Sequence, residues 1–150
     1  MSSERLSRPE LFIGVARLYG QRSSCPRAQV GVTATREGRL TASGYVGAPH
    51  GQPHCFEAGC IIENGGCIRS VHAEANMISW AARTGIPLEG TTVWSTHAPC
   101  LSCAKLLINA GIEVFVYEHP YRDYRGIELL LNQDLRTYHY PMLPAYESTS

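Results

Sequence analysis

The chain has 150 residues, 44% of them hydrophobic, and its 13 acidic and 13 basic side chains balance to no net charge. This length suits one domain, residues 1–143, followed by a flexible tail at 144–150. Neutral charge without basic runs disfavours nucleic acid as a partner, and no segment approaches the roughly 20 apolar residues of a membrane span. Arg17 interrupts the only apolar stretch near the N-terminus, so we expect no signal peptide and a cytoplasmic location.

The pattern of apolar, polar and turn-forming residues predicts one alternating α/β domain. Ser7 and Glu10 form a capping-box pattern around Pro9 at the start of the first helix. Glu37-Gly38 separates two alternating segments and favours a hairpin. Residues 46–70 are rich in Gly, Pro, Cys and His, and we expect a long ordered loop there. In chain order we expect helices at 9–22, 72–83, 100–110 and 124–131, and strands at 29–35, 39–45, 91–96, 112–117 and 136–140. The inward face of the helix at 72–83 is expected to carry Ala75, Met77, Ile78, Ala81 and Ala82.

Two short motifs carry the chemistry of the sequence. His72 and Glu74 stand at one expected helix start, and Cys100 and Cys103 follow Pro99 at another. Cysteines three apart at a helix start lie on one face, and the helix N-terminus favours the thiolate that a metal needs. One imidazole and two thiolates leave the fourth position of a zinc ion open, as in catalytic sites. We therefore predict a catalytic zinc held by His72, Cys100 and Cys103 between two helix N-termini.

Glu74 has a separate role in this prediction, because the zinc does not need it as a ligand. The spacing of the two motifs is the H-x-E and P-C-x-x-C pattern of zinc-dependent nucleobase deaminases. The mechanism expected from it uses zinc-bound hydroxide as nucleophile on an amino-bearing ring carbon and Glu74 as proton shuttle. A redox cysteine pair would leave His72 and Glu74 unused, and a purely structural zinc would need a fourth protein ligand.

The chain resembles the deoxycytidylate (dCMP) deaminases of the cytidine deaminase superfamily over about residues 9–135. The motifs that carry the resemblance are Gln29-Val30-Gly31-Val32, Gly44-Tyr45-Val46-Gly47-Ala48-Pro49, Pro53-His54-Cys55, Cys67-Ile68-Arg69-Ser70-Val71-His72-Ala73-Glu74, Cys100-Leu101-Ser102-Cys103-Ala104-Lys105 and Ile108-Asn109-Ala110-Gly111-Ile112. The resemblance implies a three-layer α/β fold, a five-stranded mixed sheet with helices on both faces. It also implies that the base is read by the Ala73 backbone and by the turn that contains Thr96, Ala98 and Pro99. Relatives usually form homo-oligomers, often hexamers, and many are activated by dCTP with Mg²⁺ and inhibited by dTTP.

The chain departs from this family at Val46, where related deaminases carry an asparagine that hydrogen-bonds the sugar. Valine neither donates nor accepts a hydrogen bond, so either another group holds the sugar or the substrate differs there. The function expected from the resemblance is hydrolytic deamination of dCMP to dUMP and ammonia. The alternatives are the same chemistry on a modified cytosine nucleotide, a nucleoside or another aminated heterocycle, a polynucleotide deaminase, and a non-catalytic zinc-stabilised binding module. An intact Glu74 argues against the last, because a binding module has no use for a proton shuttle.

Four further cysteines lie outside the catalytic motifs: Cys25, Cys55, Cys60 and Cys67. Family members often hold the long loop with a structural zinc, and Cys25 and Cys55 match positions that serve it in relatives. A closed zinc site of four cysteines suits this long loop, which has few residues to form a core of its own, because the metal contributes folding free energy. His54 is an alternative to one thiol, and simple burial of some cysteines as small apolar residues is the alternative to a site.

The family must also neutralise a 5′-phosphate, and the sequence offers several candidates without choosing among them. They are His50, His54, Arg27, Arg69, Lys105, Arg122 and Arg125. His97, beside the cysteine motif, is a candidate for contact with the nucleotide. Tyr117, Tyr121 and Tyr124 are candidates either for closing the pocket or for packing in the core.

Overall fold

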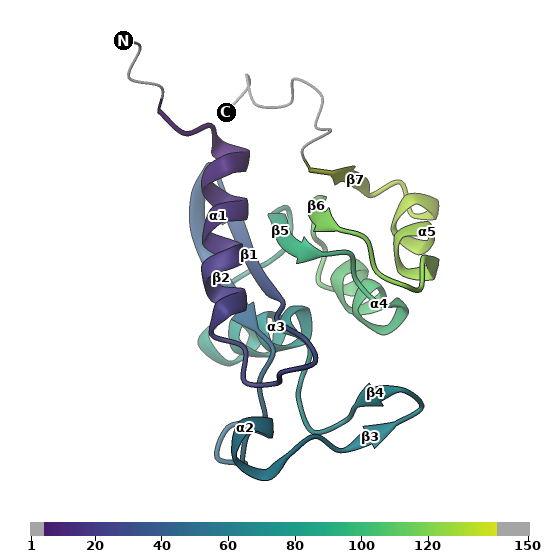
Figure 1. The fold of residues 1–150 in the computed structure, drawn as a ribbon. Helices are drawn as coiled ribbons and strands as arrows, with labels where there is room; N and C mark the ends of the chain where they lie inside the picture. The colour runs from purple at the N-terminus through teal and green to yellow at the C-terminus, as the bar shows by residue number, and fades with distance from the viewer. Residues whose placement is uncertain (1–4, 141–150) are drawn as a thin grey trace.

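The centre of the fold is a five-stranded mixed sheet, seen in a computed structural model that describes residues 5–140 (Figure 1). Its strands are β1 (Gly31–Arg36), β2 (Arg39–Tyr45), β5 (Thr92–His97), β6 (Val114–His119) and β7 (Arg136–His139). Their spatial order is β2-β1-β5-β6-β7. β1 pairs antiparallel with β2 and β5, whereas β5, β6 and β7 run parallel. The predicted mixed sheet is confirmed.

Helices cover both faces of this sheet (Figure 1). They are α1 (Arg8–Gln21), α3 (Ala73–Thr84), α4 (Leu101–Asn109) and α5 (Arg125–Asn132). Because side chains alternate between the faces of a strand, each face has its own core. α1 packs Phe12 and Ile13 against Trp94, Val114 and Val116. The larger core on the other side includes Met77, Val93, Leu107, Phe115 and Leu130.

Local signals in the sequence account for the ends of these elements. Ser7 caps α1: its hydroxyl accepts from the Glu10 amide at 3.3 Å, while Glu10 Oε2 accepts from the Ser7 amide at 2.8 Å. Glu37 and Gly38 both have positive φ, 52° and 73°, as a tight hairpin turn between β1 and β2 requires. The capping box and the hairpin are therefore confirmed.

The segment 46–70 has more regular structure than the predicted loop. It contains the short helix α2 (Cys55–Ala58) and a small hairpin of β3 (Ile62–Glu63) and β4 (Gly66–Cys67), which lies apart from the main sheet (Figure 1). Asn64 and Gly65 form its two-residue turn with φ of 50° and 79°. The prediction of a loop was wrong here because strands of two residues are too short to show a period, although Asn-Gly is a strong turn signal.

The predictions for Ala82 and for the C-terminal tail were not confirmed. Ala82 is exposed on α3, where Ala73, Met77 and Ala81 are buried, so its predicted inward position was wrong. The expected flexible tail at 144–150 lies outside the described residues. Within residues 5–140, none of the helices is long and apolar enough to cross a membrane.

Candidate active site

The two chemical motifs meet where the N-termini of α3 and α4 lie together. His72 is the N-cap residue of α3, and Cys100 is the N-cap residue of α4, which follows β5 directly. The Cys100 sulfur accepts a hydrogen bond from the Cys103 amide at 3.4 Å, so the thiol itself caps the helix. Both helices begin one residue later than predicted. The candidate ligands lie between the two helix N-termini, as the sequence indicated.

Two glycines let these helix ends approach their neighbours closely. A Cβ at Gly44 in β2 would lie 2.4 Å from the Ala73 carbonyl oxygen, at the first residue of α3. A Cβ at Gly126 in α5 would lie 2.2 Å from the Pro99 carbonyl oxygen, just before Cys100. Because no side chain fits in either place, glycine at these positions fixes where the two motifs stand.

The candidate ligand atoms of His72, Cys100 and Cys103 are spaced as a zinc ion requires. His72 Nδ1 lies 3.4 Å from Cys100 Sγ and 3.5 Å from Cys103 Sγ. Tetrahedral zinc with ordinary bond lengths separates a nitrogen and a sulfur ligand by roughly 3.6 Å. All three atoms lie within 4.8 Å of one another. The site therefore fits one zinc with three protein ligands and an open fourth position.

The electrostatics of the site favour both metal binding and proton transfer. The pKa of the Cys100 thiol falls to about 4, because Cys103 and His72 hydrogen-bond to its thiolate. The same contact with Cys100 raises the pKa of His72. Glu74 is buried, and burial raises the pKa of its carboxyl above the ordinary value. A thiolate is thus ready for the metal, beside a carboxyl group that holds a proton more readily than usual.

A cavity of about 380 Å³ opens onto these residues, and His72, Glu74 and Cys100 form part of its wall. Of the residues predicted to contact substrate, Val46, Ala73 and Ala98 line this cavity. Thr96 and Pro99 are not in its lining. The Thr96 hydroxyl instead accepts a hydrogen bond from the Gly31 amide and contacts the His97 ring. The volume lies in the range of small-molecule sites.

The lining of this cavity includes some of the predicted contact residues and not others. Two phosphate candidates, Arg27 and Arg122, line it, and so do the nucleotide candidate His97 and the pocket candidate Tyr121. The other candidates lie outside its lining: His50, His54, Arg69, Lys105, Arg125, Tyr117 and Tyr124.

Several of these outlying side chains have partners of their own. The Tyr117 ring stacks on His139 with ring centres 4.8 Å apart, and Arg125 pairs with Asp123 at 2.6 Å. The His54 ring contacts the Ser24 hydroxyl at 2.5 Å and accepts from the Ala48 amide at 3.3 Å. His54 therefore has polar partners of its own, and the ligand group of the second cluster consists of the four cysteines.

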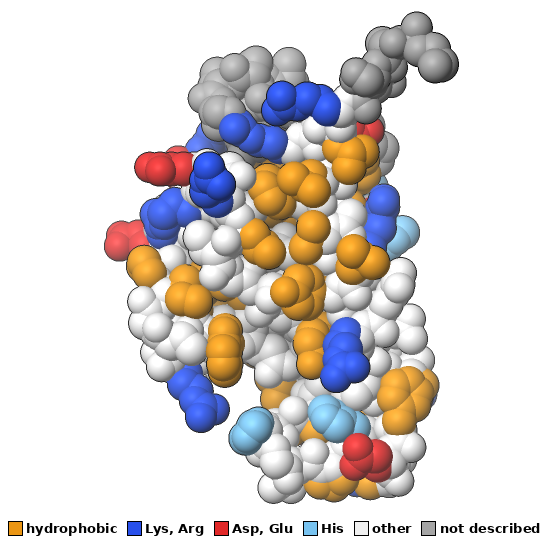
Figure 2. All heavy atoms as spheres, turned by 90° about the vertical axis from the view of Figure 1, so that its left-hand side faces the viewer, with side chains coloured by type: hydrophobic (Ala, Val, Ile, Leu, Met, Phe, Trp, Pro, Cys, Tyr) orange, Lys and Arg blue, Asp and Glu red, His pale blue; other side chains and the backbone are white. Residues whose placement is uncertain are grey.

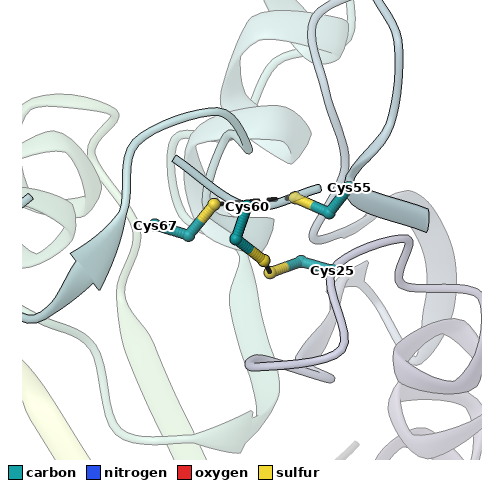
Figure 3. Close-up of side chains that lie close together, drawn as sticks. All are labelled: Cys25, Cys55, Cys60 and Cys67. Carbon is teal, nitrogen blue, oxygen red and sulfur yellow. Dashed lines mark hydrogen bonds between the residues drawn. The ribbon is translucent and has the colours of Figure 1, made fainter. Parts of the chain in front are cut away.

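The remaining four cysteines form a second cluster, with their sulfurs turned toward one another (Figure 3). Cys25 and Cys60 are 3.8 Å apart between sulfurs, and Cys55 and Cys67 are 3.5 Å apart. Four sulfurs around zinc would be separated by roughly 3.8 Å, whereas a disulfide needs about 2.05 Å. The cysteines are free thiols, so this geometry fits a closed metal site.

The local backbone also favours metal binding at this cluster. Burial opposes ionisation of Cys67, yet backbone hydrogen bonds from Arg69 and Ile61 lower its pKa to about 6. Burial raises the pKa of Cys55 to about 12, because no such donors compensate. Cys25 and Cys67 also line the active-site cavity, so the cluster adjoins the catalytic site.

Comparison with known proteins decides the family. The family model for the cytidine and deoxycytidylate deaminase zinc-binding region matches residues 6–119, a span that includes both motifs. The chain belongs to this deaminase family. It is therefore an enzyme, a hydrolytic deaminase with a zinc-binding region.

Curated relatives of this deaminase come from bacteria, phages and yeast. It is 37% identical over 130 residues to ComE operon protein 2 of Bacillus subtilis, covering 87% of this chain and 69% of the relative. It is 36% identical over 126 residues to the deoxycytidylate deaminase of Mycobacterium phage D29, covering 75% and 97%. The deoxycytidylate deaminase of Saccharomyces cerevisiae is 34% identical over 128 residues, and the match spans 81% of this chain and 41% of the yeast protein.

Solved structures show the same fold. The dCMP deaminase of cyanophage S-TIM5, crystallised in complex with dCMP and dUMP, superposes with a TM-score of 0.78 at 30% identity. The match covers 85% of this deaminase and 93% of the phage enzyme. The cytidine deaminase-like fold is therefore confirmed.

Some residues of the cavity were missed by reasoning from the sequence. Gln29, Ser70, Gly65 of the β3–β4 turn and Gly66 of β4 line the wall of the deaminase cavity. Ser70 stands two residues before His72, so its closeness to the motif was a usable signal. Gln29 and Gly65 reach the cavity only through tertiary packing, for which the sequence has no periodic signal.

Proposed function

We propose that this deaminase converts dCMP and water to dUMP and ammonia. The observation that carries the proposal is the set of His72, Cys100 and Cys103 at zinc spacing beside a buried Glu74, all at one cavity. Relatives named as deoxycytidylate deaminases, and a related structure holding dCMP and dUMP, support this choice of substrate.

In the proposed mechanism, His72, Cys100 and Cys103 hold a catalytic zinc. When bound, zinc lowers the pKa of a coordinated water to about 7 and so supplies a hydroxide nucleophile near neutral pH. Glu74 accepts one proton of the attacking water and transfers it to the ring nitrogen. It then accepts the remaining proton from the hydroxyl group now on the ring carbon and gives it to the departing amino group, which leaves as ammonia. Its raised pKa suits this cycle, because the carboxyl must be stable in both protonation states.

Val46 supports a second candidate with the same chemistry. Its side chain is 3% exposed and lines the cavity, where it can form no hydrogen bond to a sugar. A modified cytosine nucleotide, a nucleoside or another aminated heterocycle would then be the substrate. A substrate panel separates these candidates: dCMP, CMP, dCTP, deoxycytidine and 5-substituted dCMP, each followed by ammonia release from zinc-loaded protein. Faster turnover of dCMP than of the other compounds supports the proposal. Turnover of another compound without turnover of dCMP supports the second candidate.

We further propose that Cys25, Cys55, Cys60 and Cys67 hold a structural zinc. The support is the sulfur spacing and the lowered pKa of Cys67. In that role the metal would tie α2 and the β3–β4 hairpin to the segment after α1. The large apolar side chains Phe56, Ile61 and Ile62 of this region are exposed and cannot supply that tie. A homo-oligomer, activation by dCTP with Mg²⁺, inhibition by dTTP and a cytoplasmic location stay predictions from the sequence.

A further inference from the structure

The second cysteine cluster consists of two close pairs of sulfurs. Cys55 Sγ lies 3.5 Å from Cys67 Sγ, and Cys25 Sγ lies 3.8 Å from Cys60 Sγ (Figure 3). Each pair joins a buried cysteine to a half-buried one: Cys25 and Cys55 are buried, whereas Cys60 and Cys67 are half-buried. Each pair therefore combines a sulfur that a small solute can reach with a sulfur that is shielded from solvent.

The active-site cavity gives a small solute a route to this cluster. Cys67 lies in the cavity wall, and the cavity volume of about 380 Å³ is ample for a peroxide. An accessible cysteine with a second thiol beside it is the arrangement of redox-sensing cysteines, because the second thiol traps the oxidised first one as a disulfide. Both sulfur pairs have this arrangement.

The elements that carry these cysteines are short. Cys55 begins the four-residue helix α2, Cys67 ends the two-residue strand β4, and Cys60 lies between α2 and β3. A disulfide would need each pair of sulfurs to approach to about 2.05 Å. Because α2 and the β3–β4 hairpin lie outside the five-stranded sheet, this approach leaves the register of the main sheet unchanged.

We propose that the second cysteine cluster is a thiol–disulfide switch, in which a hydroperoxide converts the two sulfur pairs into the disulfides Cys55–Cys67 and Cys25–Cys60. In each pair the half-buried cysteine is oxidised first and the buried cysteine then closes the disulfide. The pairing follows from the sulfur distances and requires neither a bound metal nor the deamination reaction.

The chemistry of one pair balances with one peroxide. The Cys67 sulfur attacks a peroxide oxygen, the O–O bond breaks, and Cys67 becomes a sulfenic acid while hydrogen peroxide leaves one water. The Cys55 sulfur then attacks the Cys67 sulfur, the S–O bond breaks, and a second water leaves. The two sulfurs are oxidised by one electron each, the peroxide is reduced, and both thiol protons end in water.

The switch would change both the metal content and the cavity of the enzyme. A disulfide sulfur is not the thiolate that a metal requires, so the oxidised cluster would release a bound zinc. Cys25 and Cys67 line the active-site cavity, so a movement of their sulfurs reshapes its wall. The release of zinc rests on the proposed structural zinc, and the effect on turnover rests on the proposed function.

The test maps disulfides in zinc-loaded wild type after treatment with hydrogen peroxide. Remaining thiols are blocked with N-ethylmaleimide, and the protein is digested with trypsin and a glutamate-specific protease before mass spectrometry. Cleavage sites between and after the four cysteines place each in its own peptide: Arg27, Glu57, Glu63 and Arg69. We expect cross-links Cys55–Cys67 and Cys25–Cys60, both removed by dithiothreitol. Other pairings within the cluster, or oxidation confined to Cys100 and Cys103, would overturn the proposal.

Single variants test the order of events. In Cys67→Ser, Cys55 should stay a thiol that reacts with N-ethylmaleimide, while the Cys25–Cys60 disulfide still forms. Cys60→Ser is the matched variant of the other pair, and it should leave Cys25 as the free thiol. Cross-linking of Cys55 to another cysteine in Cys67→Ser would contradict the pairing. The wild-type map decides the pairing by itself if either variant does not fold.

The effect on turnover is measured separately from the disulfides. Ammonia release from dCMP should fall at least about tenfold as the disulfides form, since displacements of about 1 Å near a reacting centre can cost 10²-fold. Turnover should return after reduction and addition of zinc. The Cys60→Ser, Cys67→Ser double variant, compared with its own untreated sample, should lose less than wild type. An equal loss would overturn the coupling to the cavity. Both disulfides in a chain that releases no ammonia would support the switch and reject the proposed reaction.

Discussion

Single residues in this enzyme combine a chemical task with a structural one. Cys100 caps α4 with the same sulfur that lies 3.4 Å from His72 Nδ1, so the helix end orients a proposed metal ligand. Glu74 sits in the first turn of α3 and is buried, which raises its pKa and shields it from water. The proposed chemistry therefore depends on two helix N-termini being held at a fixed distance.

Glu118 gives a pH-dependent contribution to stability at the residue scale. Its hydrogen bonds from Arg17 lower its pKa in the folded state below the ordinary 4.5. The contribution is therefore full above the unfolded pKa and is lost as pH falls through the folded pKa. Because the pair is partly exposed, we expect Glu118→Gln to lower Tm by about 1–2 °C near pH 7, from about 0.5 kcal/mol of stability.

Thermal unfolding monitored by circular dichroism at a series of pH values checks this expectation. The difference in Tm between wild type and Glu118→Gln should shrink as pH falls below the unfolded pKa of glutamate and vanish once pH is below the folded pKa of Glu118, where both side chains are neutral. Loss of zinc in acid affects both proteins alike, so the difference isolates the carboxylate. A Tm difference that persists in acid would show that the effect comes from packing.

At the scale of elements, the β3–β4 hairpin and α2 depend on the second cysteine cluster. Replacing Cys60 by Ser removes one of four sulfurs at a half-buried position without a large change in volume. We expect zinc content to fall from two ions per chain to one, because the closed site loses one of its four ligands. Metal analysis by mass spectrometry measures this loss.

A variant of the other cluster is the control for this test. His72→Ala should remove the other zinc and abolish turnover while the cysteine cluster keeps its ion. Wild-type zinc content in the single Ser variants of all four cysteines would show that the cluster holds no metal.

The elements differ in how far the sequence predicts them. Long periodic segments such as α1, α4 and β6 were expected almost in place, since repeated side chains define a helix face or a buried strand. The grouping of His72, Cys100 and Cys103 was predictable because residue types at helix starts carry the signal. The β3–β4 hairpin was not predicted, and the grouping of Arg27, Gly65 and Arg122 at one cavity depends on tertiary packing. Ala82 was misplaced because alanine fits both faces of a helix.

On the scale of the whole molecule, an exposed apolar face supports the predicted homo-oligomer. Figure 2 shows hydrophobic side chains spread over the side of the molecule where α1 and β2 lie. α1 contributes Leu11 and Leu18, exposed by 43% and 65%, and β2 contributes Leu40, exposed by 44%. Exposed apolar patches of this kind are typical of protein interfaces.

A charge at this face tests the predicted assembly. Leu18→Glu should shift the protein toward a smaller species in size-exclusion chromatography with light scattering, because the new carboxylate would be buried without a partner. Leu18 is exposed in the single chain, so folding should be unaffected. Leu131→Glu, on α5 at the opposite end of the sheet and 48% exposed, is the matched control. An unchanged mass for Leu18→Glu would exclude this face as the contact.

The most direct test of the central claim is ammonia release from dCMP by zinc-loaded wild type and by Glu74→Gln, with zinc content measured on the same samples. Glutamine keeps the shape of the side chain but cannot carry a proton, and Glu74 is not one of the ligand residues. We expect equal zinc in both proteins, and a loss of kcat in the variant of about 10²–10⁴-fold. Undiminished turnover by Glu74→Gln, or no turnover of dCMP by fully loaded wild type, would contradict the account.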